Sequence, residues 1–158
     1  PDATAAFFRL DHHGQKWGHT GDIGYLDEDG FVYILGRAVD YFVDSHQQKH
    51  YLFDIENVIL QNPAVDICEV IALNVHGSFL PVAHLLLKKD FSGNAHQLLK
   101  ELHTHCQQVL PASAVPYAYK LRDSFSVKPS GKRDTEALTH ELDGYLIVTD
   151  GHIEPVNF

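Results

Sequence analysis

Residues 19–40 read HTGDIGYLDEDGFVYILGRAVD. Residues 23–26 and 31–35 follow strand patterns, and the Asp-Glu-Asp-Gly segment between them is typical of a turn with glycine at a positive φ. The stretch therefore predicts a β-hairpin. Residues 36–40 interrupt the strand pattern, and we take Arg37 to Asp40 as the boundary between two parts of the protein.

The chain after this boundary mixes helix and strand patterns. Residues 53–61 predict a helix with Asp54 as its N-cap, ended by an Asn-Pro pair. Residues 65–75 and 80–88 predict two antiparallel strands, because a Gly-Ser pair lies between them. The remaining expected elements are helices at 94–110 and 135–142, strands at 118–122 and 145–148, and a polar glycine loop at 126–132.

These elements predict a small α/β (α+β) domain over residues 38–158, with a mainly antiparallel sheet flanked by helices. Residues 1–37 would be the terminal hairpin segment of a larger domain. Cys106 falls on the apolar stripe of the helix at 94–110, so we expect this cysteine in the core.

The composition narrows the class of protein. The formal net charge of -9 argues against nucleic acid as a partner, because phosphate backbones are bound by clustered Lys and Arg. No apolar run reaches the roughly 18 residues of a membrane span, and no leader peptide is visible. Two cysteines in unrelated contexts favour a cytoplasmic location. A chain that lacks Met and begins at Pro1 predicts a piece of a longer protein, or else a processed mature chain.

Three charged side chains are candidates for chemistry. A carboxylate after a glycine turn, as at Asp22, can accept hydrogen bonds from two neighbouring hydroxyls such as those of a ribose. Arg37 follows the second hairpin strand and could lie on the same side. Lys132 follows Ser130-Gly131, where its ammonium could stabilise charge developing on a phosphate or carboxylate. Each motif alone is also common in ordinary solvated loops.

The order of the motifs is more informative than any one of them. Thr20-Gly21-Asp22, Gly36-Arg37-Ala38-Val39-Asp40, the run YLFDIENVILQNPAV at 51–65 and Pro129-Ser130-Gly131-Lys132 occur in turn. Together they resemble the adenylate-forming superfamily, which comprises acyl-CoA and aryl-CoA synthetases, adenylation domains of non-ribosomal peptide synthesis, and luciferases. The resemblance covers roughly residues 8 to 140.

The resemblance implies a role for each site residue. Asp22 and Arg37 would bind the ribose of ATP or AMP, and Asp40 would be the hinge about which a C-terminal lid rotates. Lys132 would be the catalytic lysine that bridges the carboxylic acid substrate and the α-phosphate. The implied reaction makes an acyl-adenylate and then passes the acyl group to a thiol, as acyl-CoA synthetases of fatty acid metabolism do.

The same resemblance implies cofactors and partners. ATP and Mg²⁺ would be bound mainly by an N-terminal domain of the same protein, and the acceptor would be coenzyme A or the phosphopantetheine of an acyl carrier protein. Without that domain we expect this chain to be inactive. The alternatives are a non-catalytic binding module derived from the family, an adenylation domain that charges a carrier protein, and an unrelated domain with chance motifs.

Two segments depart from the family pattern. Residues 44–49 read DSHQQK where the family has a glycine-rich passage for the thiol arm, so side chains would obstruct that passage. The residues around Lys132 are also unusual for the family. The histidines do not form a convincing metal site, because His103 and Cys106 share a helix face while His105 does not. We expect no metal and mostly surface histidines.

Overall fold

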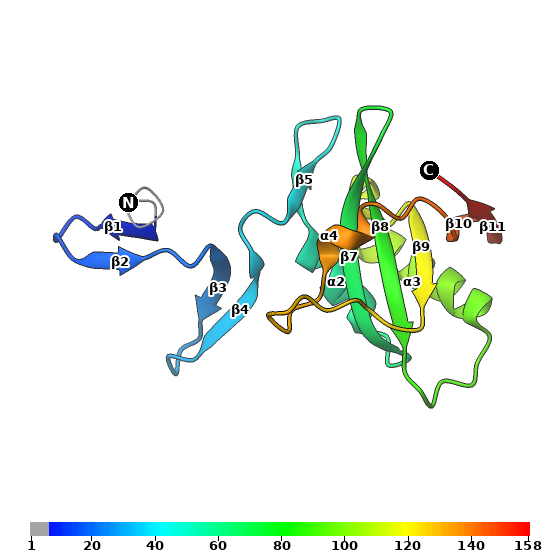
Figure 1. Ribbon diagram of the computed structural model, residues 1–158, viewed down its shortest axis with the longest axis horizontal. Coiled ribbons are helices and arrows are strands. Elements are labelled where there is room, and N and C mark those ends of the chain that lie inside the picture. The colour runs from blue at the N-terminus through cyan, green and yellow to red at the C-terminus, as the bar shows by residue number, and fades with distance from the viewer. Residues whose placement is uncertain (1–6) are drawn as a thin grey trace. The chain divides into compact units, whose positions relative to one another are not determined.

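The computed structural model describes residues 7–158 (Figure 1). The chain divides into two compact units, Pro1–Asp40 and Tyr41–Phe158, and each is described by itself. None of the helices in the described part is long and apolar enough to cross a membrane.

The described part of the first unit contains two antiparallel hairpins. One pairs β1 (Phe8–Leu10) with β2 (Lys16–Gly18), and the other pairs β3 (Asp22–Leu26) with β4 (Val32–Arg37). The second hairpin confirms the sequence prediction, whereas β1 and β2 were not predicted. The turn between β3 and β4 contains Gly30 at a φ of +85°. Asp27 stabilises the turn, because its Oδ1 accepts hydrogen bonds from the backbone of Asp29 and Phe31.

The hairpin of β3 and β4 exposes large apolar side chains on both of its faces. Val32 and Ile34 are 65% and 63% exposed, and Tyr33 and Leu35, which alternate with them, are 45% and 39% exposed. A two-stranded hairpin has no layer of its own against which to bury such side chains. All of the buried apolar residues that the described chain contains lie in the second unit.

The second unit is built on a five-stranded sheet. Its strand order is β11-β10-β9-β8-β7, and every neighbouring pair is antiparallel except β8 and β9. The expected antiparallel pair is present, joined by a turn at His76 and Gly77, which both have positive φ. The strands are β7 (Val65–Val75), β8 (Ser78–Leu87), β9 (Ala118–Arg122), β10 (Tyr145–Thr149) and β11 (His152–Val156).

Helices connect and cover these strands. The parallel pair of β8 and β9 requires a crossover connection, which contains α3 (Ala95–Val109) and the 3-10 helix η1 (Ala112–Ala114). Asn94 caps α3, because its side chain accepts a hydrogen bond from the Gln97 backbone. The other elements are the hairpin of β5 (Tyr41–Val43) and β6 (Lys49–Tyr51), α2 (Leu52–Leu60) and α4 (Thr135–Leu138).

Two of the expected helix boundaries were wrong. Asp54 is not the N-cap of α2: the helix begins at Leu52, directly after β6, with Tyr51 as an N-cap whose side chain makes no capping bond. Asp54 instead lies in the first turn, where a carboxylate interacts favourably with the positive end of the helix dipole. The helix expected at 135–142 ends at Leu138. Strand β11, which extends the sheet at its edge, was not predicted.

The sheet buries a different apolar cluster on each face. One face packs against α2 and α3 through residues such as Ile59, Leu99 and Leu102, and Cys106 is fully buried among them, as expected. The opposite face, which we call the α4 face, packs against Leu138 of α4. Figure 1 shows α4 in front of β7 and β8 with the longer helices behind. The α4-face cluster consists of Ile71, Leu73, Val82, Ala118, Leu138 and Tyr145.

Candidate functional site

Asp22 and Arg37 meet in the first unit. They are cross-strand partners at the open end of the β3–β4 hairpin, and Arg37 Nη1 lies 3.2 Å from Asp22 Oδ1. Gly21, at a φ of +81°, allows the guanidinium to approach, since an added Cβ would lie 3.3 Å from Arg37 Nη2. The Thr20 hydroxyl oxygen accepts a hydrogen bond from the Asp22 backbone at 3.2 Å. The pair therefore presents a carboxylate and a guanidinium side by side.

This pair has the donors and acceptors that a sugar needs. The side chains of Asp22 and Arg37 are 30% and 50% exposed, so both reach solvent. Their contact uses Oδ1 of the carboxylate and one guanidinium nitrogen, which leaves the second oxygen and the other N–H groups able to form further hydrogen bonds. Such a pair can bind vicinal hydroxyls or a hydroxyl and a phosphate oxygen.

Asp40 is the last residue of the first unit. It is exposed, its backbone N–H donates to the Arg37 carbonyl at 3.2 Å, and β5 begins at the next residue. The chain thus passes from one compact unit to the other directly after this side chain.

Lys132 lies on a tight hairpin loop in the second unit. The Gly131 N–H donates to the Lys128 carbonyl and the Lys128 N–H to the Lys132 carbonyl, both at 2.8 Å. Val127 and Arg133 form the antiparallel bridge below them. Gly131 has a φ of +80°, which a three-residue hairpin loop requires at its last position. The sequence folds this way because Pro129 favours the start of such a turn and glycine its end.

The cations of this loop differ in what they contact. Lys128 Nζ lies 3.4 Å from Asp134 and 3.3 Å from Glu136, and Arg133 is ion-paired with Glu69 of β7. The carboxylates of Glu136 and then Asp134 raise the pKa of Lys128. Lys132 is exposed and forms no ion pair with the described residues. Its ammonium is therefore the one in this loop that remains able to bind an anion.

The loop at 44–49 is organised by a carboxylate instead of glycines. Asp44 Oδ1 accepts from the backbone of His46 and Gln48, and Asp44 Oδ2 lies 2.9 Å from His50 Nε2. The contact with His50 and these backbone bonds lower the pKa of Asp44. Ser113 of η1 adds a hydroxyl 3.0 Å from the same nitrogen, so the hairpin is tied to the rest of the unit.

The C-terminal-domain model of AMP-binding enzymes matches residues 54–132, which is the segment from α2 to Lys132. The chain belongs to this family. Its superfamily is that of the adenylate-forming ligases, as the motifs indicated.

Curated relatives of this ligase domain support the assignment. The 2-succinylbenzoate–CoA ligase of Geobacillus sp. strain WCH70 is 36% identical over 106 residues, covering 66% of this chain and 20% of the relative. The 2-succinylbenzoate–CoA ligase of Bacillus subtilis strain 168 is 32% identical over 132 residues, covering 83% of this chain and 26% of the relative. The chain thus spans about a fifth to a quarter of the length of these ligases.

Solved structures of AMP-binding enzymes share the fold. The O-succinylbenzoate coenzyme A synthetase of Bacillus subtilis, in complex with AMP, matches with a TM-score of 0.60 and 30% identity over 83% of this chain and 24% of that chain. The ATP-bound RpMatB-BxBclM chimera B3 matches with a TM-score of 0.69 and 26% identity over 88% of this chain and 26% of that chain. The mixed α/β architecture expected from the sequence is confirmed.

A buried polar network crosses the α4 face of the second unit. His84 is fully buried, with Nδ1 3.1 Å from Arg122 Nη1 and Nε2 3.1 Å from the Tyr145 hydroxyl. Arg122 forms a two-pronged contact with Glu141, and Lys120 joins the same carboxylate at 2.7 Å. Burial, and then the charge of Arg122, lower the pKa of His84 to about 4. The expectation of surface histidines was wrong for His84 and also for His50, because both lie inside polar networks.

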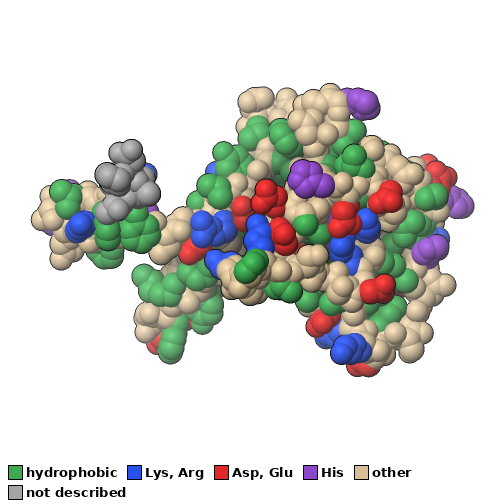
Figure 2. Space-filling view, viewed as in Figure 1, with side chains coloured by type: hydrophobic (Ala, Val, Ile, Leu, Met, Phe, Trp, Pro, Cys, Tyr) green, Lys and Arg blue, Asp and Glu red, His purple; other side chains and the backbone are tan. Residues whose placement is uncertain are grey.

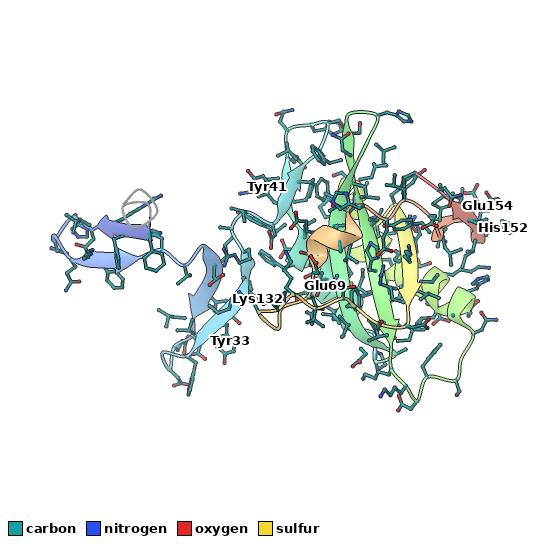
Figure 3. All side chains as sticks on the ribbon, viewed as in Figure 1. Tyr33, Tyr41, Glu69, Lys132, His152 and Glu154 are labelled. Atoms are coloured by element: carbon teal, nitrogen blue, oxygen red, sulfur yellow. The ribbon has the colours of Figure 1, made fainter. Side chains whose placement is uncertain are left out.

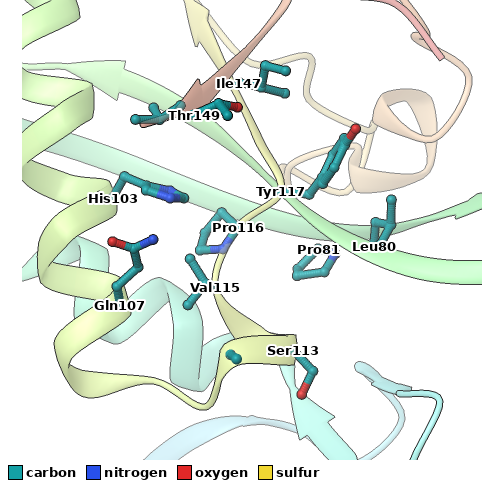
Figure 4. Close-up of a pocket in the computed structure, with 12 residues that line it drawn as sticks. Leu80, Pro81, His103, Gln107, Ser113, Val115, Pro116, Tyr117, Ile147 and Thr149 are labelled. Atoms are coloured by element: carbon teal, nitrogen blue, oxygen red, sulfur yellow. The ribbon is translucent and has the colours of Figure 1, made fainter. Parts of the chain in front are cut away.

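A pocket of about 550 Å³ lies at one end of the sheet (Figure 4). His103 and Gln107 project into it from α3, opposite Ile147 and Thr149 of β10. Its described lining contains no Lys, Arg, Asp or Glu, so it offers no ionic partner to a phosphate. A second pocket, of about 630 Å³, borders the loop at 44–47 and shares Leu80 and Ser113 with the first.

Metal ligands do not gather in this domain. Within residues 7–158, the His, Cys, Asp and Glu side chains form no group of three or more that could hold a metal ion. His103 is instead 3.2 Å from the Tyr119 hydroxyl, and Cys68 and Cys106 are free buried thiols.

Proposed function

We propose that this chain is the C-terminal part of an ATP-dependent acid–thiol ligase of the acyl-CoA synthetase type, with Lys132 as its adenylation lysine. The observation that carries the proposal is which cations of the Lys132 loop are ion-paired and which one is not. Its other cations, Lys128 and Arg133, are ion-paired within the domain, while Lys132 is exposed at a position fixed by the Gly131 turn.

The proposed chemistry has two steps. A carboxylate oxygen of the acid attacks the α-phosphorus of ATP, and pyrophosphate leaves, which gives the acyl-adenylate. The Lys132 ammonium hydrogen-bonds the acid and an α-phosphate oxygen and stabilises the charge that develops between them. The sulfur of a thiol then attacks the acyl carbonyl, the thiol proton is lost, and AMP leaves.

The first unit supports a division of the site between two domains. We propose that residues 1–37 belong to the end of an upstream nucleotide-binding domain, where Asp22 and Arg37 bind the ribose. The exposed apolar faces of β3 and β4 favour this assignment, because they would be covered by the rest of that domain. ATP and Mg²⁺ would be held mainly there, and Asp40 would be the hinge residue.

Coenzyme A is the acceptor that the relatives favour, since several are named CoA ligases. The phosphopantetheine of a carrier protein has the same thiol arm and is the alternative acceptor. Failure of the full-length protein to load an acyl group onto a carrier protein would exclude it. A non-catalytic module remains the rival, because the 44–49 loop carries side chains instead of glycines. Free buried cysteines fit a reducing compartment, so we propose a cytoplasmic location.

Pyrophosphate exchange in the full-length ligase tests the proposal. Lys132→Ala should abolish most exchange, whereas Lys128→Ala, which removes a cation of the same loop, should retain it. Equal activity of the wild type and Lys132→Ala would contradict the assignment, and an inactive full-length wild type would favour the binding module. The 158-residue chain alone should release no pyrophosphate from ATP, Mg²⁺ and any acid.

A further inference from the structure

We propose that Arg133 and Glu69 form a latch that positions Lys132 for adenylation. Arg133 directly follows Lys132, and its Nε donates a hydrogen bond to Glu69 Oε1. Figure 3 labels Lys132 on the loop that leads to α4 and Glu69 on β7. The inference rests on the proposed role of Lys132, and Arg133 and Glu69 act as positioning residues.

Glu69 is a rigid anchor for this contact. It lies in the middle of β7, opposite His84 of β8, and its side chain is only 12% exposed. The register then places Lys120 of β9 opposite His84, so the anchor belongs to a polar row across the sheet. Figure 2 shows acidic and basic side chains gathered on this face. A carboxylate so held keeps a constant position relative to the sheet.

The latch is the polar connection between the loop and the sheet. Lys128 pairs with Asp134 and Glu136, and Asp134 donates its N–H to the Ser126 carbonyl at 2.8 Å. In the described structure the other hydrogen bonds and ion pairs of residues 126–134 stay within the loop and α4. Without the Arg133–Glu69 contact, the hairpin would lose its fixed height above β7, and its internal hydrogen bonds would open more often.

The position of the ammonium matters because adenylation needs it within hydrogen-bond reach of two reacting groups. A misplacement of about 1 Å in such a site costs up to about 100-fold in rate. We therefore expect Arg133→Ala and Glu69→Gln to lower kcat for adenylation about 10-fold or more. KM for ATP should change little, because neither residue touches the nucleotide.

Amide hydrogen exchange in the 158-residue chain tests the latch without any activity. Arg133→Ala and Glu69→Gln should lower protection about 10-fold at residues 126–133 and leave β8 and β9 unchanged. Glu136→Gln is the matched control, since it removes an exposed partner of Lys128, and it should leave the contact with β7 intact. Equal protection in the wild type and both latch variants would overturn the latch.

Kinetics of the full-length ligase test the positioning role. The charge exchange Glu69→Arg with Arg133→Glu should recover part of the kcat that either single change loses, which a merely structural loss would not. If the latch variants loosen the loop in amide hydrogen exchange but leave kcat unchanged, the proposed positioning role is wrong. Full activity of Lys132→Ala would contradict the proposed function. If amide hydrogen exchange still showed the latch in that case, the Arg133–Glu69 contact would be a structural anchor only.

Discussion

Asp22 and Arg37 stand opposite each other as Cα partners of β3 and β4, with 3.2 Å between Oδ1 and Nη1. They are 15 residues apart in sequence, so the hairpin is what brings them together. The contact limits the directions in which the carboxylate can turn, and it keeps the second oxygen available for a ligand. Preorganisation of this kind reduces the entropy lost when a ligand binds.

Replacing Asp22 tests its proposed contact with ribose. In the proposed full-length ligase, Asp22→Asn should raise KM for ATP about 10-fold, because a hydrogen bond to a charged group is worth roughly 1.5–3 kcal/mol. Asp27→Asn is the control, since Asp27 accepts backbone hydrogen bonds in the turn of the same hairpin. A similar KM effect in both variants would point to hairpin damage instead of lost ribose binding.

Two neighbouring residues of α2 should differ sharply in their contribution to stability. Ile59 is fully buried and Leu60 is 41% exposed. Ile59→Ala should lower the free energy of unfolding by about 2–5 kcal/mol, through lost burial and the cavity left behind. Leu60→Ala should cost well under half as much. Urea unfolding of the chain measures both, and equal losses would show that α2 does not pack on the sheet as described.

The buried His84 should make the second unit less stable in acid. Its pKa is lowered from 6.5 to about 4, so the unfolded state binds more protons between these values. The stabilising contribution of neutral His84 to the free energy of unfolding is fully present above about pH 6.5. It is lost as the pH falls toward 4, and the total loss is roughly 3 kcal/mol. Unfolding free energies measured from pH 7 to 4 check this slope.

His84→Gln should flatten the slope, although it will lower the stability at neutral pH. His140→Gln, at an exposed histidine near the same network, should leave the slope as it is. Loss of Glu141 contacts follows at lower pH, because Arg122 and Lys120 lower the pKa of Glu141 to about 2. A wild-type slope that persists in His84→Gln would assign the acid sensitivity to other groups.

Alanine substitutions at two glycines can distinguish the effect of backbone strain on stability from an effect on the Lys132 site. Gly131 and Gly30 have φ values of +80° and +85°, and an added Cβ would meet nothing within 4 Å at either. Alanine at either position should therefore cost about 1 kcal/mol through backbone strain alone. In the proposed full-length ligase only Gly131→Ala should also reduce pyrophosphate exchange, because it changes the turn before Lys132. Equal losses of exchange would contradict a local role for this loop.

Much of this architecture follows from local sequence signals. The β3–β4 hairpin and the β7–β8 pair were predictable because strand patterns flank short turns, and α3 because of its long apolar stripe. The N-terminus of α2 was misplaced because Asp54 resembles a cap, whereas the preceding β6 strand determines where the helix begins. Tertiary pairing overrides a local signal at that position.

The buried contacts of charged side chains were not predictable in the same way. Glu69 and Arg133 are 64 residues apart, and His84 and Arg122 are 38 apart. Neither pair has a spacing that marks it, because the contact depends on which strands neighbour each other in the sheet. The alternation of β7 does place Glu69 on the same face as Ile71 and Leu73, and a carboxylate on an apolar face was the available signal.

Gln47 has a φ of +62°, in the turn that Asp44 organises. Glutamine rarely adopts this backbone conformation, and glycine adopts it without steric cost. The loop thus keeps a glycine-type backbone although residues 44–49 contain no glycine. The single change Gln47→Gly would therefore fit the existing turn without rebuilding it, and one substitution would supply a glycine at this point of the loop.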